Sequence, residues 1–187
     1  MMKRAIEMLA ALLLSATGIA GAQTPAPPRM HLTTTAFTDG GVIPIKYTGA
    51  GESVSPALSW NNVPPGTASL VLLFHDPDTA PGRNAQDFTH WIVWNIPPTV
   101  TGLDEGIKEG PLLAGGAVQG KNGRGTFAYL GPGANAAGPE HHYTFELYAL
   151  DTKLTLGPDA SRADVLAAMN GHVIGKAALE GRFKRPS

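Results

Sequence analysis

Acidic residues, histidines and a tyrosine stand at the ends of three segments that are typical of β-strands. They are Asp76, Asp78, His90, His141 and Tyr143. Loops at strand ends usually carry function, and a carboxylate beside a histidine fixes its tautomer and favours the imidazolium form. Two histidines, a tyrosine hydroxyl and nearby carboxylates suit a small pocket for a phosphate or a carboxylate. We therefore expect the chemistry of the chain at these strand ends.

Strand alternation predicts which of these side chains share a pocket. In the segment 141–150, His141 and Tyr143 project to one face and His142 to the other. By the same rule, one face of the segment 89–96 carries His90, Ile92, Trp94 and Ile96. The loop Gly131-Pro132-Gly133 precedes His141, and its glycines suit backbone amides that are free to face an anion.

Two other kinds of site remain open on these residues. A histidine with an aspartate is half of a hydrolase triad, but the chain has no G-x-S-x-G motif and no cysteine nucleophile. Asp76, His90 and His141 have the composition of a metal-binding facial triad, but H-x-H and H-x-x-x-H spacings are missing. We therefore expect no catalytic residue, no metal and no cofactor.

The elements that must position these residues are mostly strands. Apolar or alternating segments predict strands at 30–37, 42–48, 57–60, 69–75, 89–96, 126–130, 141–150 and 177–183. A helix is predicted at 161–170, because Ser161 and Asp164 form a cap and Gly171 ends it. The sequence therefore predicts a mostly-β fold, an antiparallel two-sheet β-sandwich with one or two C-terminal helices.

The N-terminus has the pattern of an export signal. Lys3 and Arg4 precede the apolar run 9–14, and the small residues 20–22 form a cleavage site before Gln23. We expect a signal peptide at 1–22, a Pro-rich tether at 23–29 and a single domain at 30–187. The apolar run is too short to span a membrane, so the mature chain is predicted to have no transmembrane span. This bacterial-looking signal and the absence of disulfides together favour the periplasm, with secretion as the second choice.

Composition narrows the class of partner. Hydrophobic content of 43% and charged content of 16% are typical of a globular domain. With a formal net charge of −1, the chain has no excess of basic residues to bind phosphate backbones, so we expect no nucleic-acid partner.

Five motifs in order resemble one known family. They are S-P-A-L-S-W at 55–60, D-P-D-T-A-P at 76–81, T-H-W at 89–91, G-P…H-H-Y at 131–143 and G-H-V-I-G-K-A-A-L-E-G-R-F at 171–183. Together they resemble the phosphatidylethanolamine-binding protein (PEBP), or Raf kinase inhibitor-like, family, and in particular its bacterial YbhB/YbcL-like branch. The resemblance spans about residues 30 to 184. Two features depart from the family pattern: the loop 133–140 lacks a double proline, and Phe88 replaces a common tryptophan.

The resemblance implies a β-sandwich with a small anion pocket for phosphate-like headgroups. The positions that match the family's binding residues are Asp76, His90, Gly131, His141 and Tyr143, with Pro81 and Pro132 at the rim. The expected partners are a small anionic ligand or a phospholipid headgroup. A protease or another envelope protein is a further expected partner, so inhibition of an envelope serine protease is the alternative function. We expect Asp76 to hold an imidazole protonated, so that affinity for an anion falls as pH rises.

Overall fold

The computed structural model describes residues 29–79 and 87–187. The predicted signal peptide, the tether up to residue 28 and the rim residue Pro81 therefore lie outside the described residues. The described elements are β1 (His31–Thr33), β2 (Gly41–Val42), η1 (Ile45–Tyr47), β3 (Leu58–Asn61), β4 (Ser69–Asp76), β5 (Phe88–Ile96), β6 (Gly102–Leu103), η2 (Ala114–Gly116), β7 (Val118–Gln119), β8 (His141–Leu150), α1 (Arg162–Met169) and β9 (Val173–Phe183). None of the described helices is long and apolar enough to cross a membrane.

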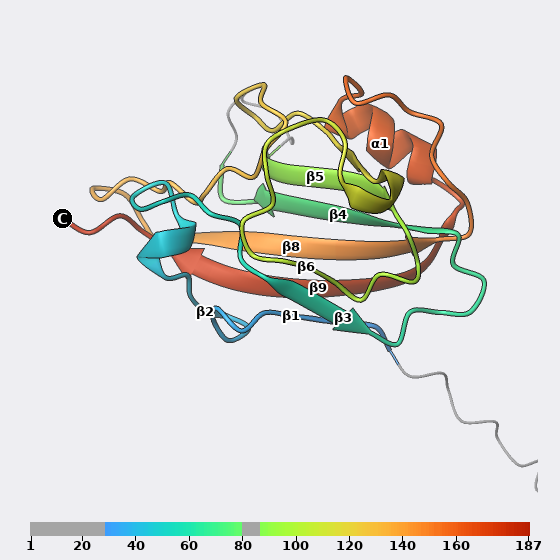
Figure 1. The fold of residues 1–187 in the computed structure, drawn as a ribbon. Coiled ribbons are helices and arrows are strands. Elements are labelled where there is room, and N and C mark those ends of the chain that lie inside the picture. The colour runs from blue at the N-terminus through green and yellow to red at the C-terminus, as the bar shows by residue number, and fades with distance from the viewer. Residues whose placement is uncertain (1–28, 80–86) are drawn as a thin grey trace, which may run out of the picture.

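The strands form two sheets, which confirms the predicted sandwich (Figure 1). The large sheet has six strands in the order β2-β9-β8-β4-β5-β7, and the small sheet has three in the order β1-β3-β6. All neighbours are antiparallel except β2, which pairs with β9 in parallel over two residues. The large sheet is therefore mixed, a small departure from the predicted antiparallel pattern.

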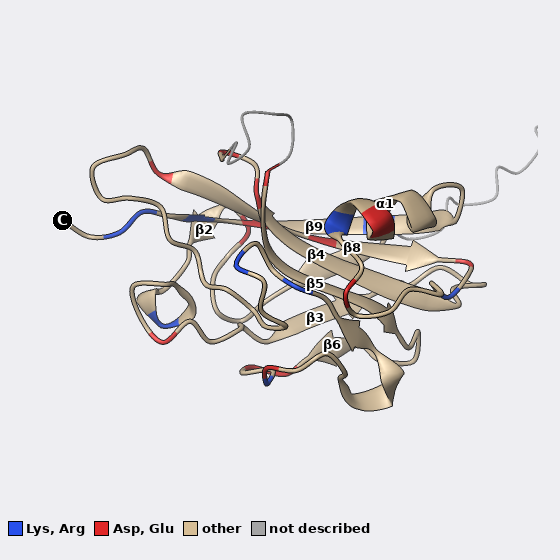
Figure 2. Ribbon diagram, turned by 90° about the horizontal axis from the view of Figure 1, so that it is seen from above, with Lys and Arg blue, Asp and Glu red and all other residues tan. Residues whose placement is uncertain are grey.

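The large sheet is covered on both faces. Figure 2 shows α1 on one side of it and β3 and β6 on the other. The inner face, toward the small sheet, carries Leu70, Leu72 and Phe74, and the outer face, toward α1, carries Val71 and Leu73. Because both faces are buried, β4 is a continuous apolar run rather than an alternating one.

Strand β5 contains two irregularities that correct the predicted alternation. Phe74 pairs with Trp91 and His75 with Thr89, so His90 is an extra residue with no partner on β4. A second extra residue lies near Asn95, whose φ of 56° marks the bend. The predicted common face of His90, Ile92, Trp94 and Ile96 is therefore wrong. His90 and Ile96 join the inner side, while Ile92 and Trp94 pack toward α1.

Two further predicted strands are largely absent from the described residues. In the segment 42–48, Pro44 starts the short 3-10 helix η1 instead of continuing β2. The segment 126–130 is a loop. There, the Asn122 side chain accepts the Thr126 N–H group and donates to the Ala128 carbonyl, so a side-chain amide replaces a strand partner.

The predicted helix is confirmed within one residue at each end. Ser161 is its N-cap, and Ser161 and Asp164 form a reciprocal capping box. Val165 and Met169 of α1 are buried against the large sheet. The helix thus covers the outer face beside Trp94 and leaves the inner face for the small sheet and the pocket.

Candidate functional site

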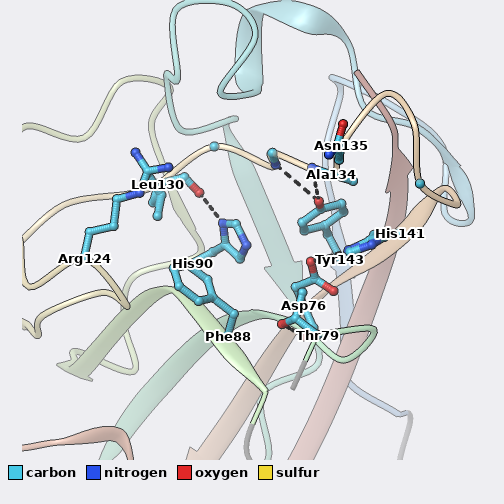
Figure 3. A pocket seen from close by; sticks show the side chains of 13 residues that line it. Asp76, Thr79, Phe88, His90, Arg124, Leu130, Ala134, Asn135, His141 and Tyr143 are labelled. Atoms are coloured by element: carbon cyan, nitrogen blue, oxygen red, sulfur yellow. Dashed lines mark hydrogen bonds and ion pairs between the residues drawn. The ribbon is translucent and has the colours of Figure 1, made fainter. Parts of the chain in front are cut away.

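A pocket of about 270 Å³ opens at the end of the sandwich where β4 finishes and β8 begins (Figure 3). The residues that line it are Asp76, Thr79, Phe88, His90, Arg124, Leu130, Gly131, Gly133, Ala134, Asn135, Gly138, His141 and Tyr143. The structure therefore brings together the five predicted positions Asp76, His90, Gly131, His141 and Tyr143. Pro132 is not among the lining residues, and Pro81 lies outside the described part of the chain.

Asp76 is the buried carboxylate of the pocket. It is the last residue of β4 and is only 2% exposed. One carboxylate oxygen accepts the Asp78 backbone N–H group at 2.9 Å, and the other is 2.8 Å from His141 Nδ1. The carboxylate thus holds the hydrogen of His141 on Nδ1, as the sequence predicted for one imidazole.

His90 is buried and electrically neutral. Its Nδ1 lies 2.7 Å from the Leu130 carbonyl oxygen, and the residue is 5% exposed. Burial lowers the pKa of His90 to about 4, although the Leu130 hydrogen bond and the Asp76 charge act in the opposite direction. The expected protonated imidazole is therefore not His90.

Tyr143 uses the amides that the sequence predicted to be free. Its hydroxyl oxygen accepts the backbone N–H groups of Gly133 at 3.2 Å and Ala134 at 3.0 Å. Burial, followed by the nearby Asp76 charge, raises the pKa of Tyr143 to about 12. The Gly131 N–H group is also occupied, because it donates to Ser53 Oγ at 2.8 Å. The prediction that Gly131 and Gly133 offer free amides is therefore wrong.

Gly131 is needed for close packing instead. A Cβ atom at this position would lie 2.6 Å from the Thr48 carbonyl carbon and 2.7 Å from the Gly49 nitrogen. The Pro132 carbonyl accepts the Gly49 N–H group at 2.7 Å. The glycine and the proline thus fix the pocket loop to the segment that follows η1.

Arg124 is the charged lining residue that sequence reasoning missed. It lies in the turn between Asn122 and Thr126, where its backbone N–H group donates to Asn122 Oδ1 at 2.9 Å. Figure 3 shows its side chain beside Leu130, on the side of the pocket opposite His141. The long glycine-rich connection that carries Arg124 was a usable signal, because long connections within compact domains are usually functional.

Comparisons with known proteins agree with this architecture. The family model described as phosphatidylethanolamine-binding protein matches residues 33–184. The chain belongs to this family. A UPF0098 protein of Methanothermobacter thermautotrophicus is 49% identical over 156 residues, which cover 83% of this chain and 99% of that protein.

Solved structures of PEBP-family proteins show the same fold. The structure of a putative PEBP homolog, CT736, from Chlamydia trachomatis has a TM-score of 0.73 at 38% identity, covering 84% of this chain and 99% of that one. YbcL of E. coli, described as a new member of the mammalian PEBP family, has a TM-score of 0.72 at 31% identity. That match covers 85% of this chain and all of YbcL.

His142 lies outside the lining of the PEBP-family pocket. Its exposed side chain is 2.8 Å from Asp78, whose carboxylate also accepts the His142 backbone N–H group. The side-chain hydrogen bond to Asp78 raises the pKa of His142, and the His142 backbone N–H group, followed by its ring, lowers the pKa of Asp78. The alternation predicted for His141 and His142 is therefore confirmed.

A second set of charges lies on the outer face of the large sheet. We call it the outer charged cluster; it comprises His75, Asp87, Glu146, Arg162 and Lys176. His75 Nδ1 is 2.6 Å from Asp87, and Arg162 of α1 pairs with the same carboxylate. This cluster connects the start of β5 to α1 and contributes no residue to the pocket lining.

No group of three or more His, Cys, Asp or Glu side chains in residues 29–79 and 87–187 is arranged to hold a metal ion. In the pocket, His90 Nδ1 bonds a carbonyl and His141 Nδ1 bonds Asp76, so both rings are oriented through Nδ1 rather than Nε2.

Proposed function

We propose that this PEBP-family chain is an exported binding protein whose pocket takes a small phosphate- or carboxylate-bearing ligand, such as a phospholipid headgroup. The observation that carries the proposal is the meeting of Asp76, His90, His141 and Tyr143 with Arg124 around one cavity. At about 270 Å³ the cavity is smaller than most drug-sized pockets, so it suits a single headgroup-sized ligand.

The charges in the pocket favour an anion despite the buried aspartate. Both oxygens of the Asp76 carboxylate already accept a hydrogen bond, one from the Asp78 N–H group and one from His141, and these donors stabilise its negative charge. The guanidinium of Arg124 lines the opposite side, and guanidinium groups match the oxygens of phosphate and carboxylate. Arg124 is therefore the cationic residue of the lining that we propose to meet the anion.

Binding is favoured over hydrolysis because the hydroxyl groups that line the pocket are not activated as nucleophiles. Among the described lining residues the hydroxyls belong to Thr79 and Tyr143. Thr79 Oγ1 donates to the Asp76 main-chain carbonyl, and burial raises the pKa of Tyr143 to about 12. Neither hydroxyl bonds a histidine that could activate it, as a hydrolytic nucleophile requires.

Calorimetric titration with inorganic phosphate and with acetate tests this proposal. His141→Ala removes the imidazole that Asp76 orients, and Asp76→Asn removes the carboxylate that orients it. Each variant should bind the anion about tenfold or more weakly, because a charge-assisted hydrogen bond contributes about 1.5–3 kcal/mol. His142→Ala is the matched control, because this neighbouring histidine lies outside the pocket lining. Equal affinities for wild type and all three variants would place the binding site elsewhere.

Export to the periplasm and a role in modulating a protein partner are parts of the same proposal. The signal pattern at residues 1–22 supports export. The family resemblance suggests an envelope serine protease as one partner class. Co-purification from a periplasmic extract with and without inorganic phosphate would show whether ligand binding alters such an association.

A further inference from the structure

The pocket-facing nitrogen of His90 is a hydrogen-bond acceptor in the neutral ring. The Leu130 carbonyl oxygen can only accept, so its 2.7 Å contact places the ring hydrogen on Nδ1. Nε2 lies on the side of the ring that faces Tyr143 and Asp76 (Figure 3). His90 therefore presents a lone pair to whatever enters the pocket.

The surroundings of His90 keep its ring uncharged. The rings of Phe74, Phe88 and Tyr143 have centroids 5.3, 5.0 and 5.2 Å from the His90 centroid. This burial lowers the pKa of His90 to about 4, and the Arg124 charge lowers it further. A ligand oxygen without a hydrogen would therefore meet Nε2 with lone pair against lone pair, and a buried polar contact of that kind costs free energy.

Phosphate ligands differ in whether they can supply the missing hydrogen. A phosphate monoester has a second pKa of about 6, so a form with a P–OH group is accessible near neutral pH. A phosphodiester has no such hydrogen at any pH of interest. A carboxylic acid loses its hydrogen near pH 4, which makes the donating form scarce at neutral pH.

We propose that the pocket selects inorganic phosphate or a phosphate monoester over a phosphodiester, with the ligand P–OH group donating to His90 Nε2 and Arg124 facing the remaining negative charge. The selection rests on the proposed anion-binding function of the same pocket. Among the ligands proposed there, it favours a free headgroup phosphate, which is a monoester, over an intact phospholipid, which is a phosphodiester. The hydrogen either arrives on the ligand or is taken from solvent when the dianion binds. In both cases the bound complex holds one proton more than the free protein and the free dianion.

Several other charged or titratable groups surround His90 and contribute to any pH profile. They are His75 and Asp76 on β4, His141 and Tyr143 on β8, and Arg124 in the turn before Leu130. Their contributions act on every anionic ligand, whereas only a monoester carries its own titrating hydrogen. The ratio of monoester to diester affinity at each pH therefore isolates the hydrogen that His90 accepts.

The test compares methyl phosphate with dimethyl phosphate by calorimetry at pH 6, 7 and 8, in buffers of different ionisation enthalpy. Methyl phosphate is expected to bind about tenfold or more tightly than dimethyl phosphate at pH 6, where about half of it carries the P–OH hydrogen, because a hydrogen bond involving a charged group contributes about 1.5–3 kcal/mol. At pH 8 its binding takes up about one proton, and its affinity is about tenfold lower than at pH 7.

His90→Phe removes the acceptor and is expected to abolish both the proton uptake and the monoester preference. His172→Phe is the matched control: this histidine is exposed, lies between α1 and β9, and pairs through Nδ1 with the Asp151 carboxylate at 2.8 Å. In wild type, nitrogen NMR of His90 reports independently whether Nε2 is unprotonated and accepts a hydrogen when methyl phosphate is added.

Two results would overturn the selection. Equal affinities for the two esters without proton uptake in wild type would refute it and leave the anion pocket standing. No binding of either ester at any pH would refute both the selection and the proposed function.

Discussion

Gln119 is the side chain on which the irregular loop beside the pocket depends most heavily. It is completely buried on β7. Its amide nitrogen donates to the carbonyls of Gly110 and Phe127, both at 2.7 Å, and its oxygen accepts the Trp91 indole N–H group at 2.6 Å. One polar side chain thus connects β5, β7 and the loop that continues to Leu130.

Gln119→Leu keeps much of the volume and removes these hydrogen bonds. The Trp91 N–H group then loses its only partner among the described residues, in a fully buried position, at a cost of about 1–3 kcal/mol. The Gly110 carbonyl also loses its hydrogen bond, but it is half-buried and can turn partly to water, so it adds less to the loss in the free energy of unfolding. The Phe127 carbonyl retains the Gly110 N–H group at 2.8 Å and adds little. The expected loss in the free energy of unfolding is about 2–4 kcal/mol.

Urea denaturation followed by tryptophan fluorescence measures this loss. Asn61→Leu is the matched control: it makes a similar amide-to-leucine change at an exposed position at the end of β3, and it should alter stability by at most about 0.5 kcal/mol. If Gln119→Leu were as stable as that control, the buried amide would not be what orders the loop, and the argument from unsatisfied polar groups would fail here.

Three shorter predictions follow from the signal, the pocket loop and His90. N-terminal sequencing of the exported protein should begin at Gln23 within a few residues, and a start at Met1 would contradict the signal peptide. Gly131→Ala should destabilise the protein by about 1–3 kcal/mol in thermal or urea unfolding, because its Cβ would clash with backbone at 2.6 Å. Gly133→Ala is the control and should be near neutral, because the nearest atom to a Cβ at Gly133 is 4.0 Å away. Since the pKa of His90 is about 4 in the fold and about 6.5 in the unfolded chain, the unfolded state binds more protons between these values. Stability should therefore fall from pH 6.5 toward pH 4, and His90→Phe should show a shallower fall than His172→Phe in urea midpoints.

The parts of the fold that could be predicted from the sequence are those with local causes. Strand β8 alternates regularly along its whole length, and α1 carries its own cap in Ser161 and Asp164. The faces of β5 could not be predicted, because the extra residues at His90 and near Asn95 are defined only by their pairing with β4. The sequence predicts a strand at 126–130 where the structure has a loop, because these apolar residues carry no sign that the Asn122 side chain satisfies their backbone groups.

Five residues of the pocket lining could be predicted from the sequence, but the roles of their groups could not. The family resemblance, not spacing, placed Asp76 and His90 beside His141. The hydrogen-bonding role of each group depends on what lies across the cavity: the Gly133 amide meets Tyr143, and His90 meets the Leu130 carbonyl. A sequence identifies a donor or an acceptor, whereas only the tertiary arrangement determines whether that group is already used.

The extra residue at His90 places this histidine in the pocket rather than in the outer charged cluster on the opposite face of the large sheet. In a regular ladder, the residue before the inward-facing Trp91 would point outward, onto the face that holds His75 and Glu146. The bulge turns His90 inward, where Phe74 and Tyr143 bury it and the Leu130 carbonyl accepts a hydrogen bond from its Nδ1–H group. The outer charged cluster can therefore pair among its own carboxylates and cations, while the pocket retains a neutral imidazole with one free lone pair. The acceptor that we assign to ligand selection thus follows from a one-residue irregularity in β5, since a strand of strict alternation would place this histidine among carboxylates on the opposite face.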